Sequence, residues 1–291
     1  MSTKEKAVNQ ITEGVIWKQL LFFFFPIMLG TLFQQLYNTA DAVVVGRFVG
    51  TRALAAVGGS TGQMVNLIVG FFVGLSSGAT VIIARYYGAK NKKDLNDTLH
   101  TAAALSVAGG ILITIAGILF TPSMLKIMKT PADVMADSAT YLRIYFGGII
   151  FVFIYNVGSA ILRAVGDSTR PLYFLIVCCF INIFLDVLLV VGFNMGVAGA
   201  AIATVVSQAV SAVLVIWALL KSTDMYCLHP KEIRFHKFLL VSIITIGLPA
   251  GIQSVMYNLA NMIIQTSLND LGTSTMAAYT AFGKIDAIYW M

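Results

Sequence analysis

The sequence predicts an all-α membrane protein, a polytopic helical bundle with a six-helix first lobe and the start of a parallel second repeat. Its 291 residues are 58% hydrophobic and 11% charged, whereas a soluble domain carries about 25% charged residues. The apolar residues form runs long enough to cross about 30 Å of hydrocarbon as helices. A pattern in the first of these runs also recurs late in the chain.

Eight apolar segments follow one another, and a short polar or charged stretch ends each of them. The first four are expected at residues 17–48, 53–86, 95–120 and 138–162, separated by stretches around Arg52, Lys90 and Lys129. The next four are expected at residues 171–193, 197–220, 238–268 and 274–291, separated by stretches around Asn194, Lys231 and Asp270. We therefore expect residues 1–222 to form the first lobe, and residues 223–291 to form a linker and the first two helices of an incomplete second lobe.

Basic residues are distributed unevenly between the loops. With the N-terminus inside, the inner segments hold thirteen lysines and arginines, whereas the outer segments hold only Arg47, Arg52, Lys126 and Lys129. Basic residues concentrate in cytoplasmic loops, so we expect a multi-pass protein of the plasma (cytoplasmic) membrane with a cytoplasmic N-terminus. The same bias accounts for the net charge of +6, and no nucleic-acid partner is expected. The first apolar run lacks a small-residue cleavage site, so we expect it to remain as a span.

The first and seventh segments share a pattern. Pro26 matches Pro249, and after one residue of slip Gly50 matches Gly272. Six spans separate the two starts, so both copies cross the membrane in the same direction. Parallel repeats of this kind are typical of secondary transporters. The chain stops inside the second copy, which predicts a fragment or truncated form of a chain with about twelve spans.

Several polar side chains are expected at one depth in the membrane. Asp41, Asp186 and Thr204 each lie eight or nine residues from the outer end of their segment, which is about 12–14 Å at the helical rise. Asn182 shares a helix face with Asp186. Two neighbouring carboxyl groups are costly to ionise together, so such a cluster takes up a proton or binds a small cation such as Na⁺. The alternative is that each acid lies near the outer interface and is hydrated.

Pro26 and a set of polar residues predict a moving helix and a cavity. Pro26 lies midway along the first segment and favours a kink, which could couple the charge of Asp41 to bending, although a static kink is an equal alternative. Polar residues of the first, second and seventh segments are expected to line a substrate cavity: Gln34, Gln35, Tyr37, Asn38, Gln63, Asn66, Gln253, Asn258 and Asn261.

The cysteines and histidines indicate no enzyme. The three cysteines have no metal-ligand spacing and are expected to be small core residues: Cys178, Cys179 and Cys227. The three histidines lie near helix ends or in loops without a recognised metal motif: His100, His229 and His236. No nucleophile–base pair is present in the pattern, and no cofactor is expected apart from a coupling ion.

Four stretches together resemble a known family: "PIMLGTLFQQLYNTADAVVVGRFVG", "ARYYGAKN", "LRAVGDSTRP" and "NIFLDVLLVVGFNMGVAGAAIAT". They resemble the multidrug and toxic compound extrusion (MATE) family, and most closely its DNA-damage-inducible-protein-F-like branch, over essentially the whole chain. The resemblance implies two six-helix lobes around a central cavity, alternating access, and export of organic cations and other drugs against entry of H⁺ or Na⁺. The chain carries no acid in its seventh segment, where another branch of the family has one.

The resemblance also assigns roles to single residues. It implies a cation-coupling site at Asp41, Asn156, Asn182, Asp186 and Thr204, and a bending proline at Pro26. The expected partners are small-molecule drugs or organic cations and membrane lipids, and the full-length protein is expected to be a monomer.

Two other functions remain open. One is a lipid or polysaccharide-precursor flippase of the same superfamily, which is expected to hold phosphates with basic cavity residues; the membrane segments here offer Arg143 and Lys284. The other is a non-transporting membrane fragment. H⁺ and Na⁺ are equal alternatives for the coupling ion.

Overall fold

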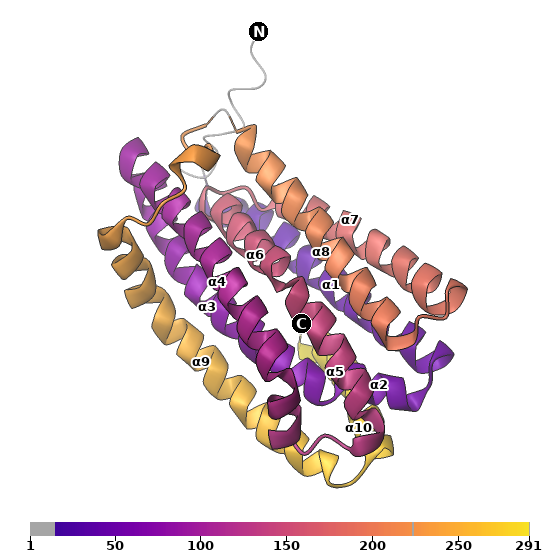
Figure 1. The fold of residues 1–291 in the computed structure, drawn as a ribbon. Coiled ribbons are helices and arrows are strands. Elements are labelled where there is room, and N and C mark those ends of the chain that lie inside the picture. Colours follow the sequence, from indigo (N-terminus) through magenta and orange to yellow (C-terminus); the bar gives the residue numbers. More distant parts are fainter. Residues whose placement is uncertain (1–14, 223, 291) are drawn as a thin grey trace.

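Helices account for nearly all of the chain that the computed structural model describes, namely residues 15–222 and 224–290. They lie side by side along a common direction and form an elongated bundle (Figure 1). Those described residues contain no strand, so the all-α prediction is confirmed. The α-helices are α1 (Ile16–Phe48), α2 (Thr51–Gly58), α3 (Ser60–Gly88), α4 (Lys92–Ile127), α5 (Ala132–Gly147), α6 (Ile149–Ala164), α7 (Thr169–Asp186), α8 (Gly196–Leu220), α9 (Lys237–Asn269) and α10 (Thr273–Trp290), with a π-helix η1 (Val187–Gly192) and a 3₁₀ turn η2 (Pro230–Glu232).

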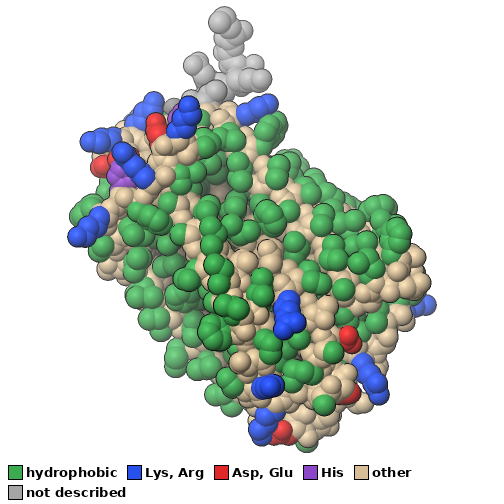
Figure 2. All heavy atoms as spheres, viewed as in Figure 1, with side chains coloured by type: hydrophobic (Ala, Val, Ile, Leu, Met, Phe, Trp, Pro, Cys, Tyr) green, Lys and Arg blue, Asp and Glu red, His purple; other side chains and the backbone are tan. Residues whose placement is uncertain are grey.

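The surface of the bundle is that of a multi-pass membrane protein. Among the described residues, six helices are long and apolar enough to cross a membrane, or seven when the bent pair α5–α6 is counted as one span. Large apolar side chains on these helices are exposed, for example Phe22 at 80% and Phe238 at 77%. Figure 2 shows hydrophobic side chains along the flank and most charged side chains at the two ends. Exposed apolar side chains are favourable in a membrane, because the lipid hydrocarbon solvates them.

Three predicted helices are interrupted. The segment expected at 53–86 breaks at Gly59 into α2 and α3, and the segment expected at 138–162 breaks at Gly148 with a bend of 49°. The fifth segment changes from α-helix to π-helix after Asp186. Thr51–Gly88 and Thr169–Gly192 still each form one candidate membrane span, whereas the prediction of a straight helix across Gly148 was wrong, because apolar periodicity does not show where packing bends a helix. At Gly148, for instance, a Cβ atom would collide with the Val205 side chain of α8. The eighth predicted span corresponds to α10, which is not among the six helices that are long and apolar enough to cross a membrane.

The repeat predicted from the sequence has the same local structure in both copies. The helices α1 and α9 each contain 33 residues and each have a proline inside, Pro26 and Pro249. Gly50 and Gly272 directly precede α2 and α10 with φ of +115° and +91°, a conformation that favours glycine. Each glycine carbonyl then accepts the N–H of the residue four positions on. Equivalent positions therefore make equivalent turns.

The two copies also pack against each other. Helix α2 meets α10 in a small apolar core that contains Ala55, Ala56, Val134, Met276 and Ala277. Helix α9 lies along α3, where glycines on both helices let the backbones approach closely, at Gly74 and Gly78 on α3 and Gly247 and Gly251 on α9. In the described residues, α9 and α10 thus share a core with the first six predicted segments. The division into lobes at residue 222 stays a prediction.

Candidate functional site

Four of the predicted site residues meet at the core of the bundle. Asp41 of α1, Asn182 and Asp186 of α7, and Thr204 of α8 are 7%, 0%, 0% and 5% exposed. The Thr204 Oγ1 atom lies 3.4 Å from Asp41 Oδ2, to which it can donate, and 3.0 Å from the Ala200 carbonyl oxygen. The Asp41 carboxyl group also interacts with the Asn182 and Asp186 side chains. The two acids are therefore buried together, not hydrated separately at the outer interface.

This cluster, Asp41–Asn182–Asp186–Thr204, contains polar atoms that lack partners. Oδ1 of Asp41 and both polar atoms of each of the Asn182 and Asp186 side chains are buried with no hydrogen-bond partner. Buried polar atoms in proteins are normally satisfied. Carboxylate, amide and hydroxyl oxygens converging in one place suit a proton or a small hard cation. The arrangement therefore has the chemistry of an ion-uptake site.

An irregular turn positions Asp186. The α-helix α7 ends at Asp186, and the next six residues, Val187–Gly192, form the π-helix η1. The Phe193 N–H donates to the Leu188 carbonyl five residues earlier, at 3.0 Å. Single π-helical turns inside helices occur frequently at functional sites. Apolar periodicity carries no signal for this change, and the sequence analysis missed it.

The structure does not bring Asn156 to the cluster. Asn156 lies on α6, and its Nδ2 donates to the Val152 carbonyl oxygen of its own helix at 2.8 Å. Its side chain lines a small separate pocket together with Phe72 of α3 and Ser106 of α4. Its assignment to the coupling site came from the family resemblance alone, and the rotation of α6 turns this side chain toward α4 instead.

A cavity of about 450 Å³ adjoins the cluster. Asp41 and Thr204 belong to both, because they also line the cavity. The remaining walls come from α1, α2, α3, α5, α9 and α10, and they include most of the predicted cavity residues: Gln35, Tyr37, Asn38, Gln63, Asn66, Asn258 and Asn261.

Two predicted cavity residues do not line this cavity. Gln34 and Gln253 are exposed and lie outside it, so their assignment to a substrate cavity stays a prediction. The first residue of α9 that lines the cavity is Tyr257. Gln253 lies one turn before it in the chain, near the close contact between α9 and α3. On α1 the corresponding turn contributes Gln35 in place of Gln34. A polar residue in an apolar run indicates that its side chain meets a polar environment. It does not indicate which cavity that side chain lines.

Other cavity residues were missed by the sequence analysis. Tyr141 and Tyr145 of α5 line the cavity, and their spacing of four residues on one helix face was a usable signal. From α10, Lys284 and Asp286 reach the same cavity, and Lys284 interacts electrostatically with Asp41. The sequence offers Lys284 only as a possible phosphate ligand. The charged groups among the described lining residues are thus two carboxyl groups and one amine.

Pro26 lies away from this cavity. Helix α1 continues through Pro26 without interruption, and the proline lines a second cavity of about 580 Å³ together with Tyr87, Arg170 and Tyr226. Whether α1 bends at Pro26 stays a prediction.

A family model described as MatE matches residues 26–188, more than half of the chain. The chain belongs to the MatE family. The matched segment contains Asp41, Asn182 and Asp186 of the cluster, whereas Thr204 lies beyond it.

Relatives agree with the MatE assignment. The probable multidrug resistance protein YoeA of Bacillus subtilis (strain 168) is 31% identical over 98% of this chain and 63% of its own length. A solved structure titled "Crystal structure of MATE in the bent conformation" superposes with a TM-score of 0.82 at 26% identity, covering 96% of this chain and 61% of that one. The corresponding "straight conformation" has a TM-score of 0.82 at 27% identity, covering 98% and 63%. The chain thus spans less than two thirds of the length of these MatE relatives.

Proposed function

We propose that this MatE chain forms the larger part of a multidrug exporter that couples drug exit to entry of H⁺ or Na⁺. The main observation behind the proposal is that Asp41 belongs both to the buried cluster and to the wall of the cavity. The name of the Bacillus subtilis relative, a probable multidrug resistance protein, supports the substrate class. The basic inner loops support a cytoplasmic-membrane location with the N-terminus inside.

Shared use of Asp41 provides a physical basis for antiport. A cation in the cluster and a cationic drug in the cavity each gain from the negative charge of Asp41, so occupancy of one site weakens binding at the other. Such coupling is reciprocal, and a ligand shifts a conformational equilibrium only by its differential affinity for the two states. Entry of the coupling ion would therefore favour release of the drug.

The composition of the cavity favours organic cations over lipid pyrophosphates. Its aromatic lining can hold cations over ring faces, with tyrosines at positions 37, 141, 145, 257 and 279. A pyrophosphate would require an excess of basic groups, whereas Lys284 is the only basic side chain among the described lining residues, which also include the acids Asp41 and Asp286. Arg143 is exposed and lies outside the cavity.

The full-length protein in proteoliposomes tests the proposal. Efflux of a cationic dye is measured under an imposed pH gradient or an imposed Na⁺ gradient, which also identifies the coupling ion. We expect Asp41→Asn and Asp186→Asn to lower ion-driven efflux by about tenfold or more, because each removes a charge from the cluster. Unchanged efflux in both variants would overturn the site.

Thr204 provides a matched comparison. Thr204→Ser keeps the hydroxyl group that lies against Asp41 and is expected to retain most of the efflux. Thr204→Ala removes that oxygen and is expected to weaken the response to the coupling ion. A lipid pyrophosphate that competes with the dye more strongly than an organic cation does would favour the flippase function.

A further inference from the structure

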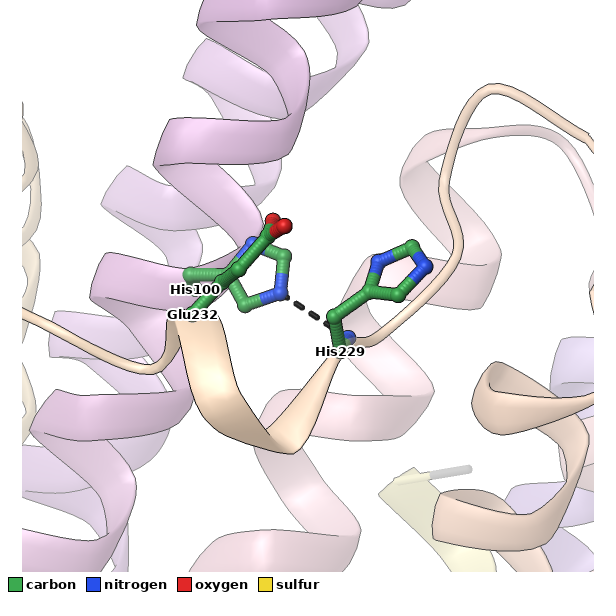
Figure 3. Close-up of side chains that lie close together, drawn as sticks. All are labelled: His100, His229 and Glu232. Atoms are coloured by element: carbon green, nitrogen blue, oxygen red, sulfur yellow. Dashed lines mark hydrogen bonds between the residues drawn. The ribbon is translucent and has the colours of Figure 1, made fainter.

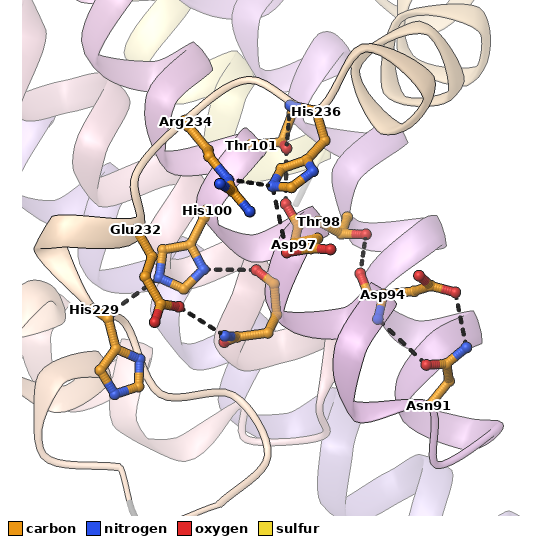
Figure 4. A network of polar contacts seen from close by, with 11 residues as sticks. Asn91, Asp94, Asp97, Thr98, His100, Thr101, His229, Glu232, Arg234 and His236 are labelled. Atoms are coloured by element: carbon orange, nitrogen blue, oxygen red, sulfur yellow. Dashed lines mark hydrogen bonds and ion pairs between the residues drawn. The ribbon is translucent and has the colours of Figure 1, made fainter.

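The linker between α8 and α9 is held against the start of α4 by polar contacts (Figure 4). The backbone N–H of His229 donates to His100 Nε2 at 2.9 Å, and that of His236 donates to Thr101 Oγ1 at 3.2 Å. The Asn96 amide donates to Glu232 Oε2 at 3.2 Å. These contacts join residues that lie more than 100 positions apart in the chain, and they bring two of the three histidines together.

His100 is fixed in an orientation that suits a metal ligand. Its side chain is 1% exposed, and its Nδ1 lies 2.7 Å from the carbonyl oxygen of Asn96. A carbonyl oxygen can only accept, so Nδ1 carries the proton and the lone pair of Nε2 points toward the linker. Metal-binding histidines typically donate their second N–H to a carbonyl or carboxylate in this way.

The 3₁₀ turn η2 brings two further ligand groups to the same place. Pro230 begins the turn, and the Glu232 N–H donates to the His229 carbonyl oxygen at 2.9 Å. The ligand atoms of His100, His229 and Glu232 all lie within 4.8 Å of one another (Figure 3). The last two residues are exposed, so an ion can reach the group from water.

We propose that His100, His229 and Glu232 bind a divalent transition-metal ion of the Zn²⁺ type. Two imidazoles and one carboxylate form a common three-ligand zinc set that leaves a fourth position for water. Tetrahedral ligation with bonds of about 2.1 Å places the ligand atoms about 3.4 Å apart, and the exposed His229 and Glu232 side chains are free to adjust to that spacing from their present positions within 4.8 Å. The ion would replace the present hydrogen bond to His100 Nε2 and would tie the linker more firmly to α4.

Zinc binding to the full-length protein tests the proposal directly. The protein is purified without a polyhistidine tag, and Zn²⁺ is titrated in competition with a chromogenic chelator. Co²⁺ absorption reports the ligand geometry. We expect one ion bound per chain at this site, with His229→Ala and Glu232→Gln each weakening the apparent affinity by about tenfold or more. His229→Ala keeps the backbone N–H that holds the linker on His100, so lost affinity would not come from a detached linker.

His236 provides the matched control. It is the third histidine of the chain and lies on the same linker, but its Nε2 is 3.3 Å from Asp97 and 3.1 Å from the Arg234 Nε, and it is not part of the proposed site. His236→Ala is expected to leave Zn²⁺ binding unchanged. Absence of saturable binding, or affinity that is equal in the wild type and in His229→Ala, would overturn the proposal. Equal loss in His236→Ala would overturn it as well, because the binding would then be general to the linker.

Discussion

At the scale of single residues, the central feature is a pair of acids with little to neutralise them. Asp186 is fully buried and neither of its carboxyl oxygens has a hydrogen-bond partner. An unpaired buried carboxylate is among the most costly groups in a protein. The Asp41 carboxyl group interacts with both Asn182 and Asp186, and we propose that a proton or cation shared by these side chains offsets that cost. We propose that this cost is what makes the cluster responsive to ions.

Ion-dependent stability follows from this arrangement. A ligand that binds only the folded state stabilises it by about 2.7 kcal/mol at a concentration 100 times its Kd. We expect the Tm of the wild-type protein in detergent to rise with proton or Na⁺ concentration, and Asp186→Asn to reduce that rise. The exposed Asp137 of α5 provides the control, since Asp137→Asn should behave as the wild type. An Asp186→Asn protein with the full ion response would contradict the prediction.

At the scale of helices, close packing between α3 and α9 depends on glycine. A Cβ atom at Gly78 would overlap the Ile243 carbonyl oxygen and the backbone of Gly247, and one at Gly74 would overlap the backbone of Gly251. Small residues allow such contacts in membranes, where van der Waals packing replaces the hydrophobic effect as the driving force. This contact joins the first and second predicted repeats.

A single methyl group at this contact is therefore expected to destabilise the protein. Gly78→Ala forces the two backbones apart, and overpacking of this kind costs about 1–3 kcal/mol. Gly88 lies at the end of the same helix, and a Cβ atom there would meet nothing within 4 Å, so Gly88→Ala should be neutral or slightly stabilising. Thermal unfolding of both variants in detergent measures the difference, and equal Tm values would contradict it.

At the scale of the whole molecule, the two ends of the bundle differ in their charged groups. One end contains the N-terminal side of α1, the start of α4 and the linker with its basic residues (Figure 1). At the other end, Arg52 and Lys129 lie 3.9 Å from Asp133 and 2.9 Å from Asp270. Two of the four basic residues at the proposed outer end thus lie within ion-pair distance of an acid. Lys4 and Lys6, which the orientation prediction also counts, lie outside the described residues.

Native cysteines can report this orientation. Cys227 is partly exposed in the linker, whereas Cys178 and Cys179 are buried. A membrane-impermeant maleimide is expected to label Cys227 in inverted vesicles and not in right-side-out vesicles, because the linker lies on the inner side. Lys129→Cys on a Cys227→Ser background should show the opposite pattern, since the Lys129 side chain is 62% exposed at the other end. The reverse labelling would contradict an inner N-terminus.

Much of the site could be derived from local rules. The depth of Asp41, Asp186 and Thr204 follows from helix ends and the rise per residue, and the structure does bring these side chains together. The place of Asn182 in the cluster follows from its spacing of four residues from Asp186, which puts both on one helix face. Asn156, however, came from resemblance alone, and no local rule relates the rotation of α6 to the other helices.

The amino-acid sequence by itself determined that the chain is a helical membrane bundle, how its spans are ordered, and that the first span's pattern recurs, because apolar run length and proline and glycine positions act locally. Only the tertiary structure decided which side chains face one another: Lys284 with Asp41, Gln35 in place of Gln34, and His100 with His229. Those encounters depend on how each helix is rotated, bent and packed against distant helices, and contacts along the whole bundle set these angles together.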